Sequence, residues 1–387
     1  MANHESLVPL KMLLFSFHAT NTIILSFLPL YLEYKELSET EIGWVLAIGP
    51  LASIFAQPFW GYMSDKFKTV KYVLLVCVIG LLIFSTIFFQ MNGLIAIMLM
   101  GAVFYFFTTP IGGLGDSLAQ RRADEVGISF GSIRTWGSVG FAISSLVIGG
   151  ILTKYGVQYM IWPYLLFGFI ALLVVLRIKD VKVESDPVKL KDVGILMKNK
   201  SFLFFLLAII FLSVTHRTND SFIGLYISEL GGSAGLVGLG WFVGVMTEAI
   251  VFATAGLWYR KFHPLIFVMG AGILYSIRWF IYGTATDPMF IIGLQFLHGL
   301  TFGVFYLAAL DFVTRLIPNI LQSTGHLVYY AVFFGISGII GSLGGGAIMD
   351  HFNGGTLYHL LGFVSLIGTA AILIYHVMFS RNRAVSQ

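Results

Sequence analysis

The chain has 387 residues, of which 57% are hydrophobic and only 11% are charged, whereas about 25% of the residues of a soluble domain are charged. A soluble protein of this length has too little interior to hold so much apolar surface, so the composition excludes a soluble enzyme, a nucleic-acid-binding protein and a disordered scaffold. The net charge of +4 is small and dispersed, and the single cysteine, Cys77, excludes an intrachain disulfide and a cysteine metal cluster.

Twelve apolar stretches are long enough to cross a bilayer, which takes about 20 mostly apolar residues. They lie near residues 8–32, 42–63, 71–91, 94–118, 132–153, 158–177, 201–227, 233–258, 265–284, 287–313, 325–349 and 355–379. Most gaps between them are too short for an independent soluble domain. We therefore predict an all-α membrane protein with twelve transmembrane helices.

Basic residues are distributed unequally between the two sides of the predicted membrane. If both termini lie in the cytoplasm, the cytoplasmic loops and tail hold 17 of the 23 Lys and Arg residues, and the outer loops hold only Lys35 and Lys154. Cytoplasmic loops are enriched in these residues, so we predict this orientation. The lysine-rich stretch 178–200 is expected to be a cytoplasmic linker between an N-terminal six-helix bundle (1–177) and a C-terminal one (201–387).

The two halves share a weak repeat with an offset of 198 residues. The segment from His18 to Asn21 (HATN) matches that from His216 to Asn219 (HRTN), and two glycines at 137 and 140 recur at 335 and 338. Two six-helix repeats are typical of an alternating-access carrier, whose site lies between the repeats near the bilayer midplane. The four polar residues at the ends of the matching segments are therefore candidate substrate-binding residues. The alternative for the histidines is that they only form contacts between helices. The glycines are explained by close helix packing, which small residues permit.

The loop after the second predicted helix contains a short motif. It reads GYMSDKFK from Gly61, which permits a tight turn, through Asp65, which can cap or pair near a helix end, to Lys68. This loop resembles the signature loop of the major facilitator superfamily, and together with twelve spans and the repeat the resemblance covers essentially the whole chain. It implies the major facilitator fold in two pseudo-symmetric halves, and a conformational or gating role for these three residues.

Several charged residues occur inside the apolar stretches. A charge at the centre of a spanning helix costs about 2.5–3.5 kcal/mol even on the most lenient scale, and such residues are usually functional. Opposite charges that share a cavity offset part of this cost, so we expect these side chains to converge on a water-filled centre. The set is Asp116, Arg134, Arg217, Asp220, Glu248 and Arg278.

Asp116 and Arg134 form the clearest predicted pair. They lie nine residues either side of Glu125, the middle of a loop between antiparallel spans, so they are expected at similar depth. The alternatives are a substrate-binding pair and a structural ion pair. The segment 131–141 resembles the fifth span of proton-coupled sugar symporters of the lactose permease type and of their phenylpropionate and nucleoside permease-like relatives. That resemblance implies sugar binding by this pair and substrate stacking on Phe141, which offers no hydrogen-bond donor.

The second half resembles the same group. Glu248 matches a sugar-binding acid of the lactose permease type, and Arg278 and His298 match an arginine and a histidine that are likewise 20 residues apart. Three positions depart from the pattern, and one of them is a lysine of the eleventh span that is absent here. The protonating glutamate of those permeases corresponds to Thr301, and a lysine corresponds to Gln295, so proton coupling must use another acid.

Glu248 and Asp220 are the candidate proton carriers, because a carboxylate in a low-dielectric cavity is easier to protonate. We expect Arg278 to be the switchable partner of Glu248, with His298 as a relay or substrate contact. The alternative for Asp220 is that it only neutralises Arg217 or Arg278.

A second candidate gate lies at the inner end of the tenth span. Asp311 and Arg315 are one helical turn apart there, which favours a gating contact or a helix-end pair.

The sequence thus predicts a proton-coupled importer of a small organic solute such as a sugar, a nucleoside or an aryl acid. The alternative is a proton-antiport exporter of drugs or metabolites. Drug antiporters of this superfamily usually have a glycine–proline motif in the fifth span, and residues 132–152 contain no proline, which counts against export. A third interpretation is a membrane sensor or flippase-like protein. We expect no catalytic residues, cofactor, metal or nucleic-acid partner, and a monomer in the inner membrane of a bacterium whose partners are the substrate, protons and lipid.

Overall fold

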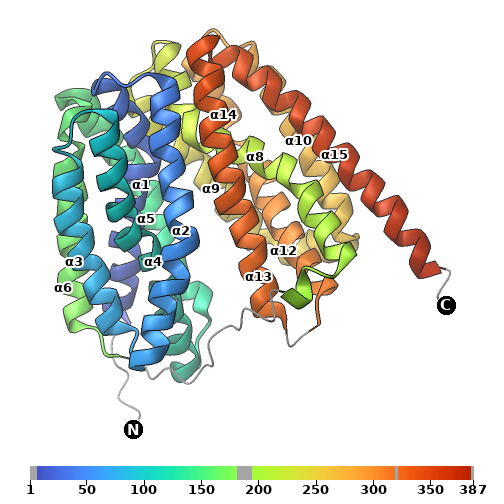
Figure 1. Cartoon of the computed structure of the whole chain (residues 1–387), viewed down its shortest axis with the longest axis horizontal. Coiled ribbons are helices and arrows are strands. Elements are labelled where there is room, and N and C mark those ends of the chain that lie inside the picture. The colour runs from blue at the N-terminus through green and yellow to red at the C-terminus, as the bar shows by residue number, and fades with distance from the viewer. Residues whose placement is uncertain (1–6, 181–193, 319–320, 385–387) are drawn as a thin grey trace. The chain divides into compact units, whose positions relative to one another are not determined.

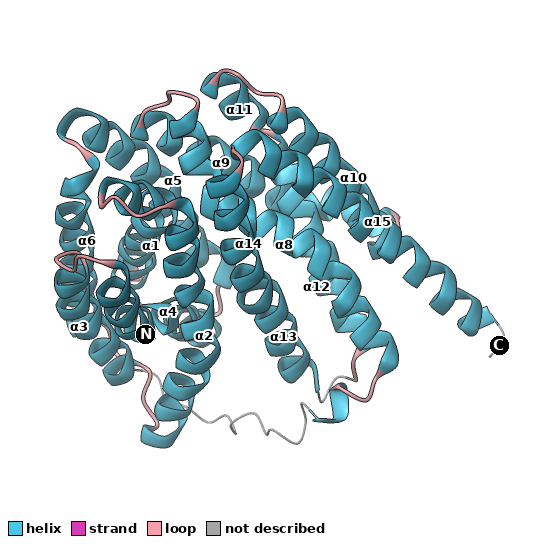
Figure 2. Cartoon of the chain, turned by 45° about the horizontal axis from the view of Figure 1, so that its top comes forward, coloured by secondary structure: helices cyan, strands magenta, loops and turns pink. Residues whose placement is uncertain are grey.

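The structure, a computed structural model, describes residues 7–180, 194–318 and 321–384. Helices and connecting loops make up this described part of the chain, which contains no strand (Figure 2). Twelve helices in it are long and apolar enough to cross a membrane, which confirms the predicted fold class. Most of the expected linker, residues 181–193, lies outside the described residues.

The helices follow one another closely along the chain (Figure 1). The first six spans are α1 (Val8–Tyr34), α2 (Glu39–Phe67), α3 (Lys71–Phe88), α4 (Leu94–Val126), α5 (Phe130–Tyr155) and α6 (Ile161–Arg177). The second six contain α8 (Lys200–Glu229), α9 (Ala234–Trp258), α10 (Pro264–Gly283), α11 (Pro288–Leu294), α12 (Val304–Leu316), α13 (Gln322–Tyr330), α14 (Ser337–His351) and α15 (Gly354–Ala384).

The helices form two compact units. The first is Met1–Pro187 with Ser233–Phe242, and the second is Val188–Gly232 with Val243–Gln387, so the start of α9 packs with the first unit. In the first unit α1 contacts α5 and α6, and α3 contacts α4 and α6. In the second unit α8 contacts α14 and α15, and α10 contacts α12 and α15. The same pairing of equivalent helices in each unit is the structural counterpart of the sequence repeat.

Short-range sequence signals set several helix ends. Ser38 and Glu41 form a capping box at the start of α2, with backbone-to-side-chain hydrogen bonds of 3.3 and 3.0 Å. Asp180 has the same function for α3 from a distance in sequence. Its carboxylate accepts the backbone N–H groups of Val70 and Lys71 at 3.1 and 3.0 Å, and such groups at a helix start otherwise have no partner.

The tenth and eleventh spans are not continuous α-helices. A π-helical segment, Gly299–Gly303, lies between α11 and α12, and a second one, Ala331–Ile336, lies between α13 and α14. π-helical turns are rare and occur frequently at functional sites. The second unit therefore contains two irregular turns within its spans, and the candidate site lies next to both.

Gly140 permits the close contact of α5 with α1. A Cβ at this position would lie 2.3 Å from the backbone carbonyl oxygen of Phe15. We expect Gly140→Val to destabilise the protein by about 1–3 kcal/mol or more, because backbone atoms must move to relieve the overlap. The melting temperature in detergent measures this effect. Gly150→Val is the matched control on the same helix, since nothing lies within 4 Å of its Cβ, and equal melting of the two variants would contradict the argument.

Candidate functional site

In the first unit, the expected contact between Asp116 and Arg134 is present. The Nε of Arg134 in α5 lies 3.2 Å from Oδ1 of Asp116 in α4. The Asp116 side chain is 37% exposed and the Arg134 side chain is 33% exposed. The pair is therefore accessible to a ligand and is not buried between the helices. An accessible carboxylate and guanidinium together present acceptors and donors for hydroxyl groups.

His18 in α1 and Arg134 meet above Gly137. A Cβ at Gly137 would lie 2.5 Å from Cδ2 of His18 and 2.7 Å from Nη1 of Arg134. Glycine therefore gives both side chains the space to lie against the α5 backbone. The Nε2 atom of His18 is buried and has no hydrogen-bond partner among the described residues. The sequence favours close packing for this glycine, and the structure places the side chains of two candidate site residues against it.

Two other predicted residues of the first unit lie differently. The ring of Phe141 is buried and packs against Trp241, with ring centroids 5.8 Å apart. Asn21, by contrast, is exposed. The described contacts thus occupy Phe141 with protein and leave Asn21 available to solvent or a ligand.

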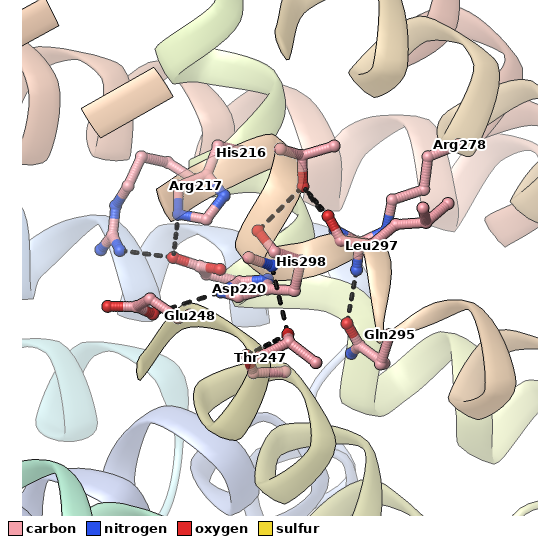
Figure 3. A network of polar contacts seen from close by, with 12 residues as sticks. His216, Arg217, Asp220, Thr247, Glu248, Arg278, Gln295, Leu297 and His298 are labelled. Atoms are coloured by element: carbon pink, nitrogen blue, oxygen red, sulfur yellow. Dashed lines mark hydrogen bonds and ion pairs between the residues drawn. The ribbon is translucent and has the colours of Figure 1, made fainter. Parts of the chain in front are cut away.

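In the second unit, α8 brings three polar side chains together within about one turn (Figure 3). Asp220 Oδ2 lies 2.8 Å from Nη1 of Arg217 and 3.4 Å from Nε2 of His216. The side chains of His216 and Asp220 are only 3% and 6% exposed. The i,i+3 and i,i+4 spacings put the three on one face of the helix. One carboxylate thus serves both an arginine and a histidine in an apolar surrounding.

Glu248 in α9 and His298, just before the first π-helical segment, form a second pair. Their Oε2 and Nε2 atoms are 3.6 Å apart, and the Glu248 side chain is 23% exposed. This pair adjoins the group of His216, Arg217 and Asp220, because the ring centroids of His298 and His216 are 5.7 Å apart. Phe302 stacks on His216 with a centroid distance of 4.2 Å and an interplanar angle of 6°. The two histidines therefore lie between the two acids in one connected cluster, in the order Glu248, His298, His216 and Asp220.

Arg278 in α10 is fully buried and is bound by neutral groups (Figure 3). It donates to Thr301 Oγ1 at 3.0 Å, to the Tyr282 hydroxyl at 3.0 and 3.2 Å, and to Gln295 Oε1. Its guanidinium also lies over the rings of Tyr282 and Trp279. None of these described partners is a carboxylate. The expected pairing of Arg278 with Glu248 is thus not what the structure contains, because Gln295 and Thr301 take up the guanidinium's donors.

Sequence reasoning overlooked several members of this cluster. Phe302 is one helical turn after His298, and that spacing could have indicated it. Gln295 and Thr301 accept hydrogen bonds from Arg278. The sequence did not indicate this role, because the resemblance to the permeases marks both positions only as departures from the family pattern. Thr247 was not considered, yet its hydroxyl accepts the backbone N–H of Gly299 at 3.2 Å.

Asn219 lies apart from the cluster. Its side-chain oxygen accepts a hydrogen bond of 3.0 Å from the hydroxyl of Tyr358 in α15, and both side chains are buried. This geometry favours a contact between helices over substrate binding for Asn219. The equivalent Asn21 of the repeat is exposed, so the two asparagines do not share one environment.

The predicted gating residues lie at helix ends. Asp311 and Arg315 are in contact at 2.7 Å, and Asp311 also accepts a 2.7 Å hydrogen bond from the hydroxyl of Tyr259. Burial, and next the hydrogen bond to Asp311, raise the pKa of the Tyr259 phenol, so it remains a donor at any physiological pH.

The loop after α2 is held mainly by backbone contacts. Lys68 adopts a left-handed conformation at the end of α2, and its backbone N–H donates to the carbonyl of Asp65 at 3.3 Å. The expected tight turn at Gly61 is wrong, because Gly61 and Asp65 lie within α2, which continues to Phe67, and the chain turns at Lys68. Gly61 has open space at its Cβ position. The Thr69 hydroxyl contacts Asp180, which fixes the loop to the end of α6.

Comparison with known proteins agrees with this architecture. The model of the MFS_1 like family matches residues 7–360. The chain is 26% identical to a maltose permease of Geobacillus stearothermophilus, covering 88% of this chain and 87% of that one. It is 27% identical to a probable 3-phenylpropionic acid transporter of Escherichia coli, covering 96% of each. The crystal structure of the nucleoside transporter NupG superposes with a TM-score of 0.86 at 16% identity, over 95% of this chain and 98% of that one.

Removal of Arg278 tests whether the neutral network is essential to the second unit. We expect Arg278→Met to lower stability by at least about 2 kcal/mol, because each buried acceptor left without a partner costs about 1–3 kcal/mol. Arg315→Met is the control, since that side chain is 56% exposed and exposed pairs contribute at most about 1 kcal/mol. Thermal melting in detergent, followed by tryptophan fluorescence, compares the two. A melting temperature of Arg278→Met at or above that of Arg315→Met would refute the prediction.

Proposed function

This chain belongs to the MFS_1-like family of major facilitator transporters, and we propose that it imports a small polar organic solute together with protons by alternating access. It is a multi-pass membrane transporter and not an enzyme. The observation that supports proton coupling is the connected cluster of two acids and two histidines in the second unit. Such residues within spanning helices are costly and typically form proton relays.

The charges of the cluster balance. Arg217 and Arg278 carry two positive charges, and Asp220 and Glu248 carry two negative charges when both are ionised. Uptake of one proton by either acid therefore leaves one uncompensated positive charge inside an apolar bundle, which is unfavourable. A rearrangement that exposes the cluster to the other side of the membrane and releases the proton removes this charge. This supports coupling of protonation to a conformational step.

Glu248 is the best candidate for the group that takes up the proton. It is more exposed than Asp220, and its ion-pair partner, His298, can itself carry a proton. The route then continues from His298 to His216, whose rings are 5.7 Å apart, and from His216 to Asp220 at 3.4 Å. Asp220 is shared with Arg217 and is the more buried end of this route. Arg278, which is bound to neutral groups, serves as a fixed cation.

The first unit supplies the best candidate for substrate recognition. The pair of Asp116 and Arg134 is accessible, and His18 beside it has an unpartnered ring nitrogen. These groups together suit a solute with several hydroxyl groups, or with a carboxylate that Arg134 can bind. A sugar, a nucleoside and an aryl acid therefore remain the proposed substrate classes, and the names of the relatives include all three.

Replacement of Glu248 separates coupling from binding. We expect Glu248→Gln to abolish uptake driven by a pH gradient, because glutamine cannot carry the proton, while exchange between labelled and unlabelled substrate continues. Proteoliposomes supplied in turn with maltose, uridine and 3-phenylpropionate measure both activities. Glu36→Gln, which changes an exposed acid outside the spans, should behave as the wild type. Gradient-driven uptake that survives in Glu248→Gln would exclude Glu248 as the proton carrier, and gradient-driven efflux in the wild type would favour the exporter.

Substrate binding at the first unit is tested by thermal shift. A ligand at 100 times its Kd adds about 2.7 kcal/mol to stability, and we expect the same three compounds to reveal at least one such shift. Asp116→Asn and Arg134→Ala should abolish it. Glu125→Gln is the control, because it removes an ion pair with Arg122 near the end of the same helix. A shift of equal size in all four proteins would remove Asp116 and Arg134 from the proposed site.

A further inference from the structure

A concave site on the first unit is lined by none of the polar residues proposed for transport. It is a cavity of about 560 Å³ between the end of α2 and the start of α3. Its walls are almost entirely apolar, with the aromatic rings of Phe59, Trp60, Phe67 and Tyr72 beside valines of α3.

The wall of this cavity is held in place by contacts within the unit. The indole N–H of Trp60 donates to the backbone carbonyl of Phe106 at 3.0 Å, and the Trp60 ring packs on that of Phe107 with centroids 5.5 Å apart. The hydroxyl of Thr69 in the lining is engaged by Asp180. The cavity thus offers a preformed apolar surface, which suits a hydrocarbon chain and not a polar solute.

The cavity is lined partly by exposed side chains of two predicted spanning helices. Phe67 and Tyr72 are each 62% exposed and Val76 is 47% exposed, and all three belong to helices that are long and apolar enough to span a membrane. The neighbouring residues of the loop are basic. Lys66 Nζ lies 5.7 Å from the centroid of the Phe67 ring that lines the cavity, and Lys68 is exposed one residue further on.

Positive charge dominates the rim. Lys71 begins α3, and its Nζ donates to the carbonyl of Leu176 at the end of α6, where Arg177 and Lys179 are exposed. Among the described residues of the rim, two acids oppose these five basic residues. The Asp180 carboxylate accepts the backbone N–H groups at the start of α3, which compensate its charge. Asp65 is the other, so the described part of the rim retains a net positive charge.

We propose that this cavity binds one anionic phospholipid, with an acyl chain against the aromatic wall and the phosphate group at Lys66 and Lys68. Clusters of Lys and Arg directly beside a spanning helix bind anionic headgroups, and the apolar cavity adds a place for the chain. A headgroup with an ammonium group, as in phosphatidylethanolamine, brings a positive charge to a rim that is already positive. The preferred ligand is therefore a phospholipid with net negative charge, such as phosphatidylglycerol.

The test is native mass spectrometry of the full chain, purified in a neutral detergent and titrated with equimolar phosphatidylglycerol and phosphatidylcholine of equal chain length. We expect one phosphatidylglycerol to be retained in preference to phosphatidylcholine. The double variant Lys66→Gln/Lys68→Gln should reduce that preference by roughly 25-fold, since each basic residue near an anionic headgroup contributes about fivefold. The double variant Lys35→Gln/Lys154→Gln, which alters lysines outside this rim, should leave it unchanged.

A second variant tests the cavity. Val76→Trp fills it from an exposed position and should also abolish the retained lipid, whereas Ile83→Trp, at an exposed position of α3 outside the lining, should not. Equal retention of the two lipids by the wild type would overturn the proposal. Retention that survives Val76→Trp would show that the cavity does not hold the chain. Displacement of the lipid by 10-fold excess inorganic phosphate would identify a simple phosphate site, and either result overturns the proposal.

Discussion

A guanidinium inside a bilayer must find its hydrogen-bond acceptors within its own helix bundle, because hydrocarbon offers none. Arg278 meets this constraint with a tyrosine hydroxyl, a threonine hydroxyl and a glutamine oxygen, drawn from three successive parts of the second unit. These contacts tie α10 to the interrupted helix that carries His298. The acids and histidines of the cluster then occupy the neighbouring space without having to neutralise Arg278 directly. The arrangement of the whole polar cluster thus depends on how this one cation is satisfied.

The two units solve the same problem in different ways. In the first unit the ion pair of Asp116 with Arg134 remains about one-third exposed. In the second unit Asp220 and Arg278 are buried, and each of them contacts several polar side chains. An accessible pair can exchange protein contacts for a ligand at little cost, whereas a buried network changes only when its protonation or its helices change. This difference supports the proposed division between recognition in the first unit and coupling in the second.

The spans were predictable because hydrocarbon requires long apolar helices, and this requirement appears directly in composition. The contact of Asp116 with Arg134 was predictable for a similar reason, since two residues equally far from a helix turn lie at equal depth. Pairing between distant helices was not. Glu248 contacts His298 and not Arg278, because the acceptors of Arg278 are neutral residues that carry no signal in a count of charges. The ends of helices were harder to predict. The helix α4 ends at Val126, eight residues beyond the predicted apolar stretch, because a helix can extend past the membrane into water, where its residues need not be apolar.

The π-helical segment at Gly299–Gly303 alters how positions along the tenth span relate to one another. Its hydrogen bonds run from i to i+5 and accommodate one residue more than an α-helical turn. Every residue after Gly303 is therefore rotated by about 100° around the helix axis relative to an uninterrupted α-helix. Asp311 and Arg315 therefore point in a different direction from the one that a helical wheel continued from His298 would predict for them. That wheel would place the adjacent residue of the sequence in their position. When this span is aligned with a regular α-helix, structurally equivalent residues on one side of the π-helical segment are therefore offset by one position in the sequence.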